Sequence, residues 1–204
     1  MGKFTEYIGS QFGNPRGFVG KCCCVIMNII NKAMYRRIVS AVCLTEHSKA
    51  LDIGYGNGYL IEQLYKKYHS EIYGIDISED MKNHAEKRNR RALIDGKLHL
   101  ETGDCCNMRY DDCFFDAVTS VNTVYFWSDT VQGLKEIHRT LKADGVFCNV
   151  VYTKEWLQSL AYTKKGFKFF EREDFIRQGK QAGFTEVSIQ EISKGKSFMV
   201  IYRK

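Results

Sequence analysis

The sequence predicts an α/β fold, a mostly parallel sheet with helices on both of its faces. Two observations lead to this prediction. Short apolar runs typical of buried strands alternate with longer segments in which apolar residues recur every three or four positions. The last two strand-like runs have no helix between them, so we expect the last strand to enter the sheet antiparallel, as one arm of a hairpin.

The chain begins with a region that differs from the rest. Turn-forming residues are dense between Gly9 and Gly20, and apolar residues from Val19 to Val42 recur at helical spacing. Residues 1–45 are therefore expected to form a loop and a helix, which act either as a lid over a site or as a cap on the sheet edge. Residues 46–204 are expected to form the core, and 204 residues suit a single domain.

The first half of the core shows the clearest alternation. Ala50–Ile53 is a buried apolar run followed by glycine, and Tyr59–Tyr68 carries apolar side chains on one helical face. Ile72–Ile75 is the next apolar run. Ser78, followed by two acidic residues, has the pattern of a helix N-cap.

The second half of the core continues the pattern. Lys97–Glu101 alternates like a third strand, and Asp116–Val121 and Val146–Val151 are further strand-like runs. Apolar residues from Val131 to Leu141 predict a helix that closes at Asp144-Gly145. The remaining expected elements are a helix over Glu171–Ala182 with Gly183 as its C-cap, and the strands Phe184–Ile189 and Phe198–Tyr202.

The formal net charge of +6 is mild and scattered along the chain. The densest basic group, from Lys87 to Arg91, follows a predicted helix, where cations are mildly stabilising. Since no interleaved aromatic residues accompany it, we expect a solvated face rather than a nucleic-acid surface.

The eight cysteines indicate free thiols. Cys22–Cys24 are contiguous, Cys105 and Cys106 are adjacent, and no paired CxxC or HxxxH spacing occurs, so no metal site is expected. The absence of a secretory signal pattern favours a reducing, cytoplasmic location. The apolar run over 22–30 is too short to span a bilayer, so no membrane association is expected.

Ligand-binding residues are expected where strands end. The segment LDIGYGNG, from Leu51 to Gly58, joins the first strand to its helix, and its three alternate glycines let the backbone turn tightly and approach a ligand. The dinucleotide pattern G-x-G-x-x-G would need glycine where Tyr59 stands. The loop therefore argues against a nicotinamide-dependent dehydrogenase, which is the alternative from another enzyme class.

Acidic residues follow the next two strands. Asp76, in YGIDIS, can accept hydrogen bonds from both hydroxyls of a ribose, or it can simply precede a helix, as acidic residues commonly do. Asp104, in Gly103-Asp104-Cys105, can accept from an adenine amino group while the next backbone N–H meets a ring nitrogen, or it can belong to an ordinary turn. Three consecutive strand ends thus carry a glycine loop, a ribose acceptor and an adenine acceptor.

Together these motifs resemble those of the class I S-adenosylmethionine-dependent methyltransferases. The matching stretches are LDIGYGNGYL, YGIDIS, GDCCNMRYDDCFFDAV, VNTVYFW and LKEIHRTLKADG, in the family's order. The N-terminal SQFGNPRGFVGK is similar to that of a small bacterial subgroup, the methyltransferases of type 11. Tyr55, where many members carry Cys or Ala, and Met108 to Tyr110, in place of Leu-Pro-Phe, depart from the pattern.

The resemblance implies a Rossmann-like sheet of seven strands, with S-adenosylmethionine laid across the strand ends and S-adenosylhomocysteine as the product. Asp76 would lie by the ribose, and Asp104 with Cys105 by the adenine. Asn122 and Thr123 would face the sulfonium. The cofactor-binding residues that it implies are Asp52, Gly54, Tyr55, Gly56, Asn57, Gly58, Asp76, Ile77, Asp104, Cys105, Asn122 and Thr123.

The implied reaction is methyl transfer to a small-molecule acceptor. The alternatives are a soft acceptor such as a thiol or arsenite, a quinone-type carbon acceptor, and a non-catalytic module that only binds the cofactor. Side chains contiguous on a helix point about 100° apart, so Cys22–Cys24 cannot all face one ligand. With a single proline, Pro15, the chain lacks the Asn/Asp-Pro-Pro-aromatic motif of enzymes that methylate bases, so no nucleic-acid partner is expected.

Candidates for a catalytic role are few. They are Tyr125, Asn122 and His138, with His47 as a further possible base. Tyr125 follows the fourth strand and can face the pocket or pack in a buried loop, whereas His138 is expected to be exposed on a helix. The aromatic residues within 152–170 predict either an acceptor pocket or a covering layer.

Overall fold

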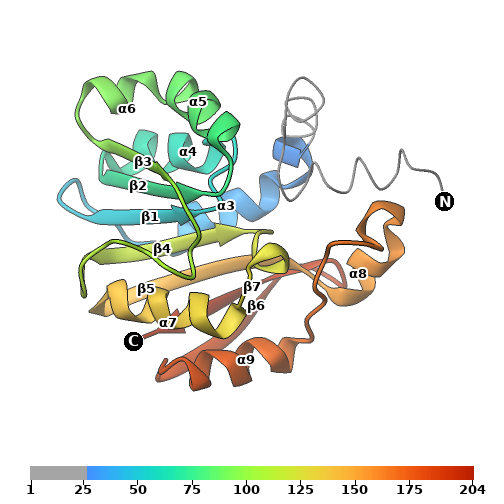
Figure 1. The fold of residues 1–204 in the computed structure, drawn as a ribbon. Coiled ribbons are helices and arrows are strands. Elements are labelled where there is room, and N and C mark those ends of the chain that lie inside the picture. Colours follow the sequence, from blue (N-terminus) through green and yellow to red (C-terminus); the bar gives the residue numbers. More distant parts are fainter. Residues whose placement is uncertain (1–26) are drawn as a thin grey trace.

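A computed structural model describes residues 27–204 of the chain (Figure 1). Seven strands form one sheet in the order β3-β2-β1-β4-β5-β7-β6. The strands β1 to β5 pair in parallel, whereas β7 is antiparallel to both β5 and β6. The predicted Rossmann-like α/β sheet and its antiparallel last strand are confirmed. The strands are β1 (Lys49–Ile53), β2 (Glu71–Asp76), β3 (Leu98–Thr102), β4 (Phe115–Val121), β5 (Leu141–Tyr152), β6 (Glu186–Ser193) and β7 (Ser197–Arg203).

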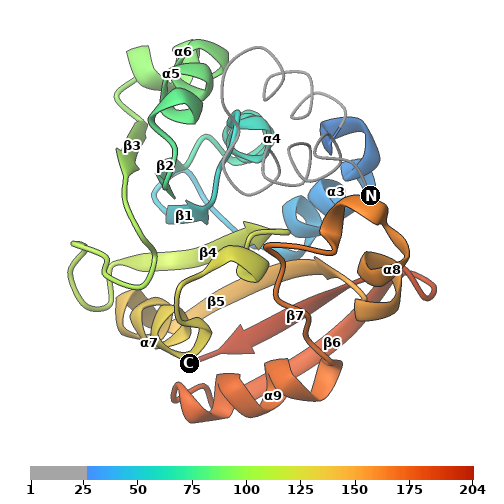
Figure 2. The same ribbon diagram turned by 45° about the vertical axis from the view of Figure 1, so that its right-hand side comes forward.

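Helices cover both faces of this sheet (Figures 1 and 2). One layer contains α3 (Lys32–Ala41), α4 (Tyr59–Tyr68), α5 (Glu79–Arg88) and α6 (Arg90–Ile94). The opposite layer contains α7 (Thr130–Thr140), α8 (Lys154–Ser159) and α9 (Arg172–Gln181). The short 3-10 helices are η1 (Val124–Phe126) and η2 (Ala161–Thr163).

The strand β1 shows why the sheet must be covered twice. Successive side chains of a strand point to opposite faces. Ala50 packs in the cluster formed with α3 to α6, whereas Leu51 and Ile53 pack in the cluster formed with α7 to α9. A strand that is apolar on both faces is typical of a parallel sheet between two helical layers.

Most predicted elements match, and the largest error concerns α7. The predicted helix closes at Asp144-Gly145, but α7 ends at Thr140 and these two residues belong to β5. At Leu141 the backbone is already extended, with ψ 140°, and Leu141 pairs with Phe115 of β4. The buried leucine that completes the apolar helical pattern is therefore the first residue of the strand.

The region before β1 contributes a docked helix. Residues 27–30 are helical, Asn31 interrupts the helix, and α3 follows. Met34 and Ile38 are buried in the core, so α3 is packed against the sheet. The remainder of the predicted loop and helix, including Pro15 and Cys22–Cys24, lies outside the described residues. Within residues 27–204, no helix combines the length and the apolarity that crossing a bilayer would require.

Candidate active site

A cavity of about 290 Å³ lies at the carboxyl ends of β1, β2, β3 and β4. Its lining comes from the residues that follow each of these strands, together with side chains from the N-terminal helical region and from the segment around η1. In open α/β sheets this edge is where ligands bind, because helix and loop ends leave a crevice there. The lining residues are Met27, Asn28, Tyr35, Ile53, Gly54, Tyr55, Gly56, Asn57, Ile75, Asp76, Ile77, Gly103, Asp104, Cys105, Val121, Asn122, Thr123, Phe126, Trp127 and Ser128.

Asp76 organises the glycine loop. Its carboxylate accepts one hydrogen bond from the backbone N–H of Gly56 at 2.8 Å and another from that of Ser78 at 2.9 Å. Burial raises the pKa of Asp76, and these backbone hydrogen bonds oppose the rise. Each carboxylate oxygen has a second lone pair, so both can still accept from a ligand in the cavity.

Two glycines of the loop meet different surroundings. Gly54 has φ +68°, and a Cβ built on it would lie 2.4 Å from Cγ2 of Thr123, so only glycine fits there. Gly56 has φ +51°, and a Cβ on it would meet no atom within 4 Å. Because Gly56 lines the cavity, its missing side chain leaves room for a ligand against the backbone.

Asp104 holds the turn that follows β3. It accepts hydrogen bonds from the backbone N–H of Cys106 at 2.9 Å and from the Ser128 hydroxyl at 2.9 Å. Burial alone would raise the pKa of Asp104, but these hydrogen bonds bring it below its usual value. A hydrogen bond from Cys105, together with the one that the Ser128 hydroxyl donates, outweighs burial and lowers the pKa of the Cys106 thiol to about 6.

Arg139 of α7 fixes the loop that continues from this turn. Its guanidinium donates to the backbone carbonyls of Met108 at 3.0 Å and Tyr110 at 2.7 Å, and to the carboxylate of Glu136. Met108, a departure from the family pattern, is buried. The segment is thus held by hydrogen bonds to α7, although it lacks the proline common in the family.

Asp52 is buried and lies behind the cavity rather than in its lining. Burial raises the pKa of Asp52 to about 7, although the Thr119 hydroxyl donates to its carboxylate at 2.9 Å. Gly58 also lies outside the lining. A Cβ on Gly58 would lie 2.5 Å from Nδ2 of Asn89, so this glycine permits α5 to pack against the loop.

The structure therefore brings together all but two of the predicted cofactor-binding residues, the exceptions being Asp52 and Gly58. Sequence reasoning missed several lining residues because their positions have no motif of their own. Ser128 directly follows the VNTVYFW segment, and Met27, Asn28 and Tyr35 lie within the range of the predicted N-terminal helix. The only signal for this last group was the expectation that a helix covers the site.

A second, smaller cavity adjoins the first. The two cavities share Met27, Asn122 and Phe126, so Asn122 stands at their junction. Asn122 has φ +58°, a left-handed conformation that is uncommon outside glycine. The lining of the small cavity is aromatic and aliphatic, with amide and phenol groups as its polar part. Its residues are Met27, Ile30, Asn31, Asn122, Tyr125, Phe126, Tyr152, Leu157, Tyr162 and Phe167.

Hydrogen bonds connect the polar groups of the small cavity. The Tyr125 hydroxyl accepts from the backbone N–H of Tyr152 at 2.7 Å and donates to Oδ1 of Asn122 at 3.2 Å. The Tyr152 hydroxyl donates to Oδ1 of Asn31 at 2.6 Å. Burial raises the pKa of Tyr125 well above its usual range, so this phenol is protonated at neutral pH.

The histidine candidates lie elsewhere. His138 is partly buried rather than exposed as expected, and its ring packs edge-on against Phe184, with the ring centres 5.2 Å apart. It lines neither cavity. His47 precedes β1 and is exposed. It therefore lies near the amino ends of the strands, whereas the cavities lie at their carboxyl ends. Of the predicted catalytic candidates, Tyr125 and Asn122 line the two cavities described, whereas His138 and His47 line neither.

Comparison with known proteins decides the family. A family profile described as a methyltransferase domain matches residues 51–149. The uncharacterized methyltransferase YdaC of Bacillus subtilis is 30% identical over 166 residues, which cover 81% of this chain and 87% of that protein. The chain belongs to the class I S-adenosylmethionine-dependent methyltransferases. It is therefore an enzyme whose cofactor is S-adenosylmethionine, and the dehydrogenase and non-catalytic alternatives are set aside.

Other relatives of the methyltransferase have named acceptors. Demethylmenaquinone methyltransferase of Staphylococcus saprophyticus is 25% identical, over 95% of this chain and 94% of that protein. A rice chloroplast 2-methyl-6-phytyl-1,4-hydroquinone methyltransferase is 27% identical over 146 residues, and the chain spans 43% of its length.

The fold agrees with solved methyltransferase structures. An S-adenosylmethionine-dependent methyltransferase from Aquifex aeolicus superposes with a TM-score of 0.67 at 19% identity, covering 82% of this chain and 88% of that chain. At this level of identity the likeness shows the fold alone.

Proposed function

We propose that the enzyme transfers a methyl group to a largely apolar, aromatic small molecule, with carbon methylation of a hydroquinone-type acceptor as the specific reaction. The observation that carries this proposal is the lining of the small cavity beside Asn122. Among the described residues, that lining contains no acidic, basic or histidine side chain. Burying a charged acceptor there would be costly, because no opposite charge could compensate it.

The larger cavity fits the cofactor. Its volume of about 290 Å³ is near the lower end of the range for ligand pockets, and it extends from Asp104 past Asp76 to Asn122. In the proposed arrangement Asp76 accepts from the ribose hydroxyls, Asp104 and Cys105 lie by the adenine, and the backbone at Gly56 lies along the methionine portion. When bound, S-adenosylmethionine supplies an electrophilic methyl group on its sulfonium.

The junction of the two cavities fixes where the acceptor would approach. With the adenosine at the β2 and β3 ends, the sulfonium would face Asn122 at the end of β4. The small cavity has a volume of about 40 Å³, room for roughly three water molecules, so an acceptor ring would enter it only as the lining side chains move apart. An acceptor there would meet the methyl group across Asn122 and Phe126, which line both cavities. Holding both reactants in this geometry, away from water, is the main contribution of the protein to the rate.

The absence of a base in this lining favours an acceptor that is already nucleophilic. Among the described residues that line the small cavity, the titratable groups are phenols, and burial raises the pKa values of Tyr125, Tyr152 and Tyr162. A hydroquinone ring carries electron-rich carbon atoms beside its hydroxyl groups and can react without a strong protein base. The named acceptors of two relatives, demethylmenaquinone and a phytyl hydroquinone, support this class.

A soft acceptor is the second candidate and is less favoured. No cysteine belongs to the small-cavity lining among the described residues, so nothing there would hold a thiol or arsenite. In contrast, Ile30 lines the small cavity and is 53% exposed, and its neighbour Ile29 is 72% exposed. An apolar tail on the acceptor would lie over the exposed side chain of Ile30.

Formation of S-adenosylhomocysteine over a panel of acceptors tests the proposal. The panel contains a hydroquinone with a short isoprenoid side chain, a simple phenol, an alkyl thiol, a primary amine and arsenite. We expect turnover with the hydroquinone, and mass spectrometry with NMR should locate the new methyl group on ring carbon. Turnover confined to the thiol, the amine or arsenite would overturn the assignment of the acceptor.

A further inference from the structure

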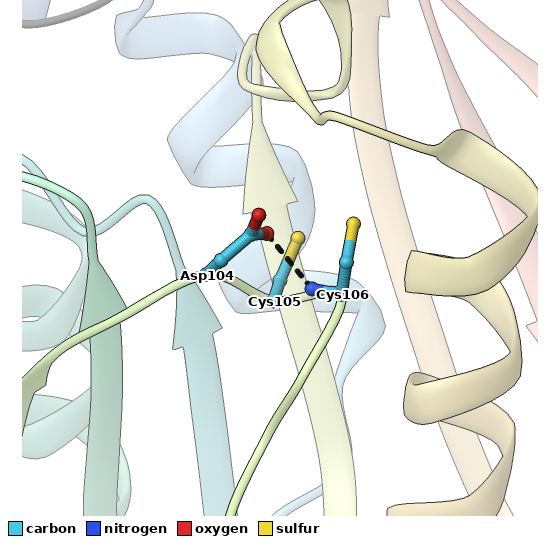
Figure 3. Close-up of side chains that lie close together, drawn as sticks. All are labelled: Asp104, Cys105 and Cys106. Atoms are coloured by element: carbon cyan, nitrogen blue, oxygen red, sulfur yellow. Dashed lines mark hydrogen bonds between the residues drawn. The ribbon is translucent and has the colours of Figure 1, made fainter.

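Two cysteines and a carboxylate gather at the turn after β3, where two of the three residues, Asp104 and Cys105, also line the cofactor cavity. Asp104, Cys105 and Cys106 are consecutive, and their side chains project toward the same side of the turn (Figure 3). The carboxylate oxygen and the two sulfur atoms all lie within 4.8 Å of one another. Cys105 is 5% exposed, and Cys106 is partly exposed.

The turn itself holds these side chains together. The backbone N–H of Cys106 donates to Oδ1 of Asp104, which bends the chain so that consecutive residues present their side chains to one side. The Ser128 hydroxyl contacts both Oδ2 of Asp104 at 2.9 Å and Sγ of Cys106 at 3.2 Å. Ser128 therefore links the Asp104 carboxylate to the Cys106 thiol.

This geometry suits a bridging metal ion better than a disulfide. Consecutive Cα atoms are about 3.8 Å apart, below the usual range for disulfide-bonded cysteines, so a bond between Cys105 and Cys106 would be strained. Zinc binds thiolate sulfur at about 2.3 Å and carboxylate oxygen at about 2.0–2.2 Å in a tetrahedral arrangement. Small side-chain movements would bring the three ligand atoms to those distances from a common centre.

We propose that Asp104, Cys105 and Cys106 form a site for a thiophilic divalent cation of the zinc type, and that its occupation excludes the methyl donor. Each thiol releases its proton to solvent as the metal–sulfur bond forms, and a water molecule completes the fourth position. The exclusion follows because Asp104 and Cys105 also line the cofactor cavity. This second part rests on the proposed position of the adenine, whereas cation binding itself does not.

The site is separate from the acceptor region. None of its three residues belongs to the small-cavity lining, which lies beyond the end of β4 and includes residues after β5. A cation at the β3 end would therefore act as an inhibitor and not as a methyl acceptor.

Cadmium binding to the full-length chain tests the first part, with the ultraviolet thiolate-to-cadmium charge-transfer band as the readout. Cys106→Ser should weaken cadmium binding by at least about 100-fold, because it removes one of the two thiolate ligands of the chelate. Cys113→Ser, at an exposed free cysteine elsewhere, is the matched control and should leave binding unchanged. Equal binding with and without Cys106, measured also in a chain freed of the other exposed thiols, would overturn the site.

A second chain removes the competing thiols. Replacing Cys22, Cys23, Cys24, Cys43 and Cys113 by serine leaves the adjacent pair and the buried Cys148. We expect this chain to bind one equivalent of cadmium and to lose it on the further change Cys106→Ser. If the five replacements abolish binding, the cation is held by those cysteines and the proposal fails.

Calorimetry with S-adenosylhomocysteine tests the second part. Saturating zinc should raise the apparent Kd for S-adenosylhomocysteine at least about tenfold in wild type, and Cys106→Ser should remove this effect. Zinc binding that leaves the Kd unchanged would contradict the exclusion. If S-adenosylhomocysteine does not bind even without zinc, the proposed cofactor position fails, while the cadmium result still decides the cation site.

Discussion

The cofactor cavity and the small cavity share three residues, yet they are built from different parts of the chain. The first is built around four consecutive strand ends, where backbone and the polar side chains of Asp76 and Asp104 lie among apolar and aromatic ones. The second is formed by aromatic and aliphatic side chains from the N-terminal helical region, η1, the end of β5 and the segment 157–167. The difference indicates that the enzyme recognises a fixed cofactor through turn geometry and its acceptor through side-chain packing.

The largest effect is expected from Asp76, which belongs only to the cofactor cavity. Asp76→Ala should weaken binding of S-adenosylhomocysteine by at least about 100-fold, since it removes an acceptor for the ribose and for the N–H groups of Gly56 and Ser78. Asp76→Asn keeps the shape of the side chain and should weaken binding less than Asp76→Ala. Calorimetry measures the affinity, and circular dichroism checks that each variant is folded. An unchanged affinity would show that Asp76 does not bind the cofactor.

Asp52 lies behind the same cavity and should give the stability of the free enzyme a pH dependence. Its pKa of about 7 in the folded state exceeds the ordinary value of 3.8, so the folded state keeps a proton that the unfolded state has lost. The free energy of unfolding should therefore fall as pH rises from about 4 to 7, by on the order of 3 kcal/mol, and then level off.

The variant Asp52→Asn isolates this effect from other titrating groups. It should match wild type near pH 4 and be more stable than wild type at pH 8, as measured by urea unfolding without cofactor. Parallel pH profiles for the two proteins would contradict the raised pKa.

Substitutions of the two loop glycines should affect different properties, stability at Gly54 and ligand binding at Gly56. Gly54→Ala should lower stability by about 3 kcal/mol, because it combines a left-handed backbone with a collision against Thr123. Gly56→Ala should cost about 1 kcal/mol of stability but weaken S-adenosylhomocysteine binding about tenfold, since its methyl group would occupy ligand space. Thermal unfolding and calorimetry on both variants measure the contrast. If Gly54→Ala and Gly56→Ala lowered stability equally and weakened binding equally, the two glycines would not have separate roles.

The smallest effect is expected from Tyr152, which belongs only to the small cavity. Tyr152→Phe removes the hydrogen bond to Asn31 and should lower kcat/KM for the acceptor about fivefold while leaving cofactor affinity unchanged. Tyr68→Phe is the matched control, because that hydroxyl bonds to α3 carbonyls far from either cavity. A loss of cofactor affinity in Tyr152→Phe would mean that the two cavities are not separate in function.

The same contrast explains what the sequence could predict. Local features predict the helix Tyr59–Tyr68 and the succession of β1, β2 and β3 along the chain. These features are apolar periodicity and the glycine and acidic residues at strand ends. The predicted end of α7 was wrong because Leu141 fits the apolar pattern of the helix, although its buried side chain belongs to the first residue of β5. The position of Asp52 behind the cavity depends on the depth of β1 within the sheet, which no local pattern shows.

The sequence predicted two alternatives for the region of the small cavity, an acceptor pocket or a layer that covers the sheet. The aromatic residues within 152–170 have the same sequence pattern whether they line a pocket or cover the sheet. In the structure they do both, since Tyr162 lines the small cavity while Phe170 packs against Phe175 of α9. Only the three-dimensional path of the chain after α8 separates these roles.

A crystal structure of the complex with S-adenosylhomocysteine tests the central claim most directly. We expect the ribose hydroxyls within hydrogen-bonding distance of the Asp76 carboxylate, the adenine beside Asp104 and Cys105, and the sulfur atom directed at Asn122 and the small cavity. A ligand bound elsewhere, or one whose sulfur atom points away from Asn122, would contradict both the cofactor position and the route proposed for the acceptor.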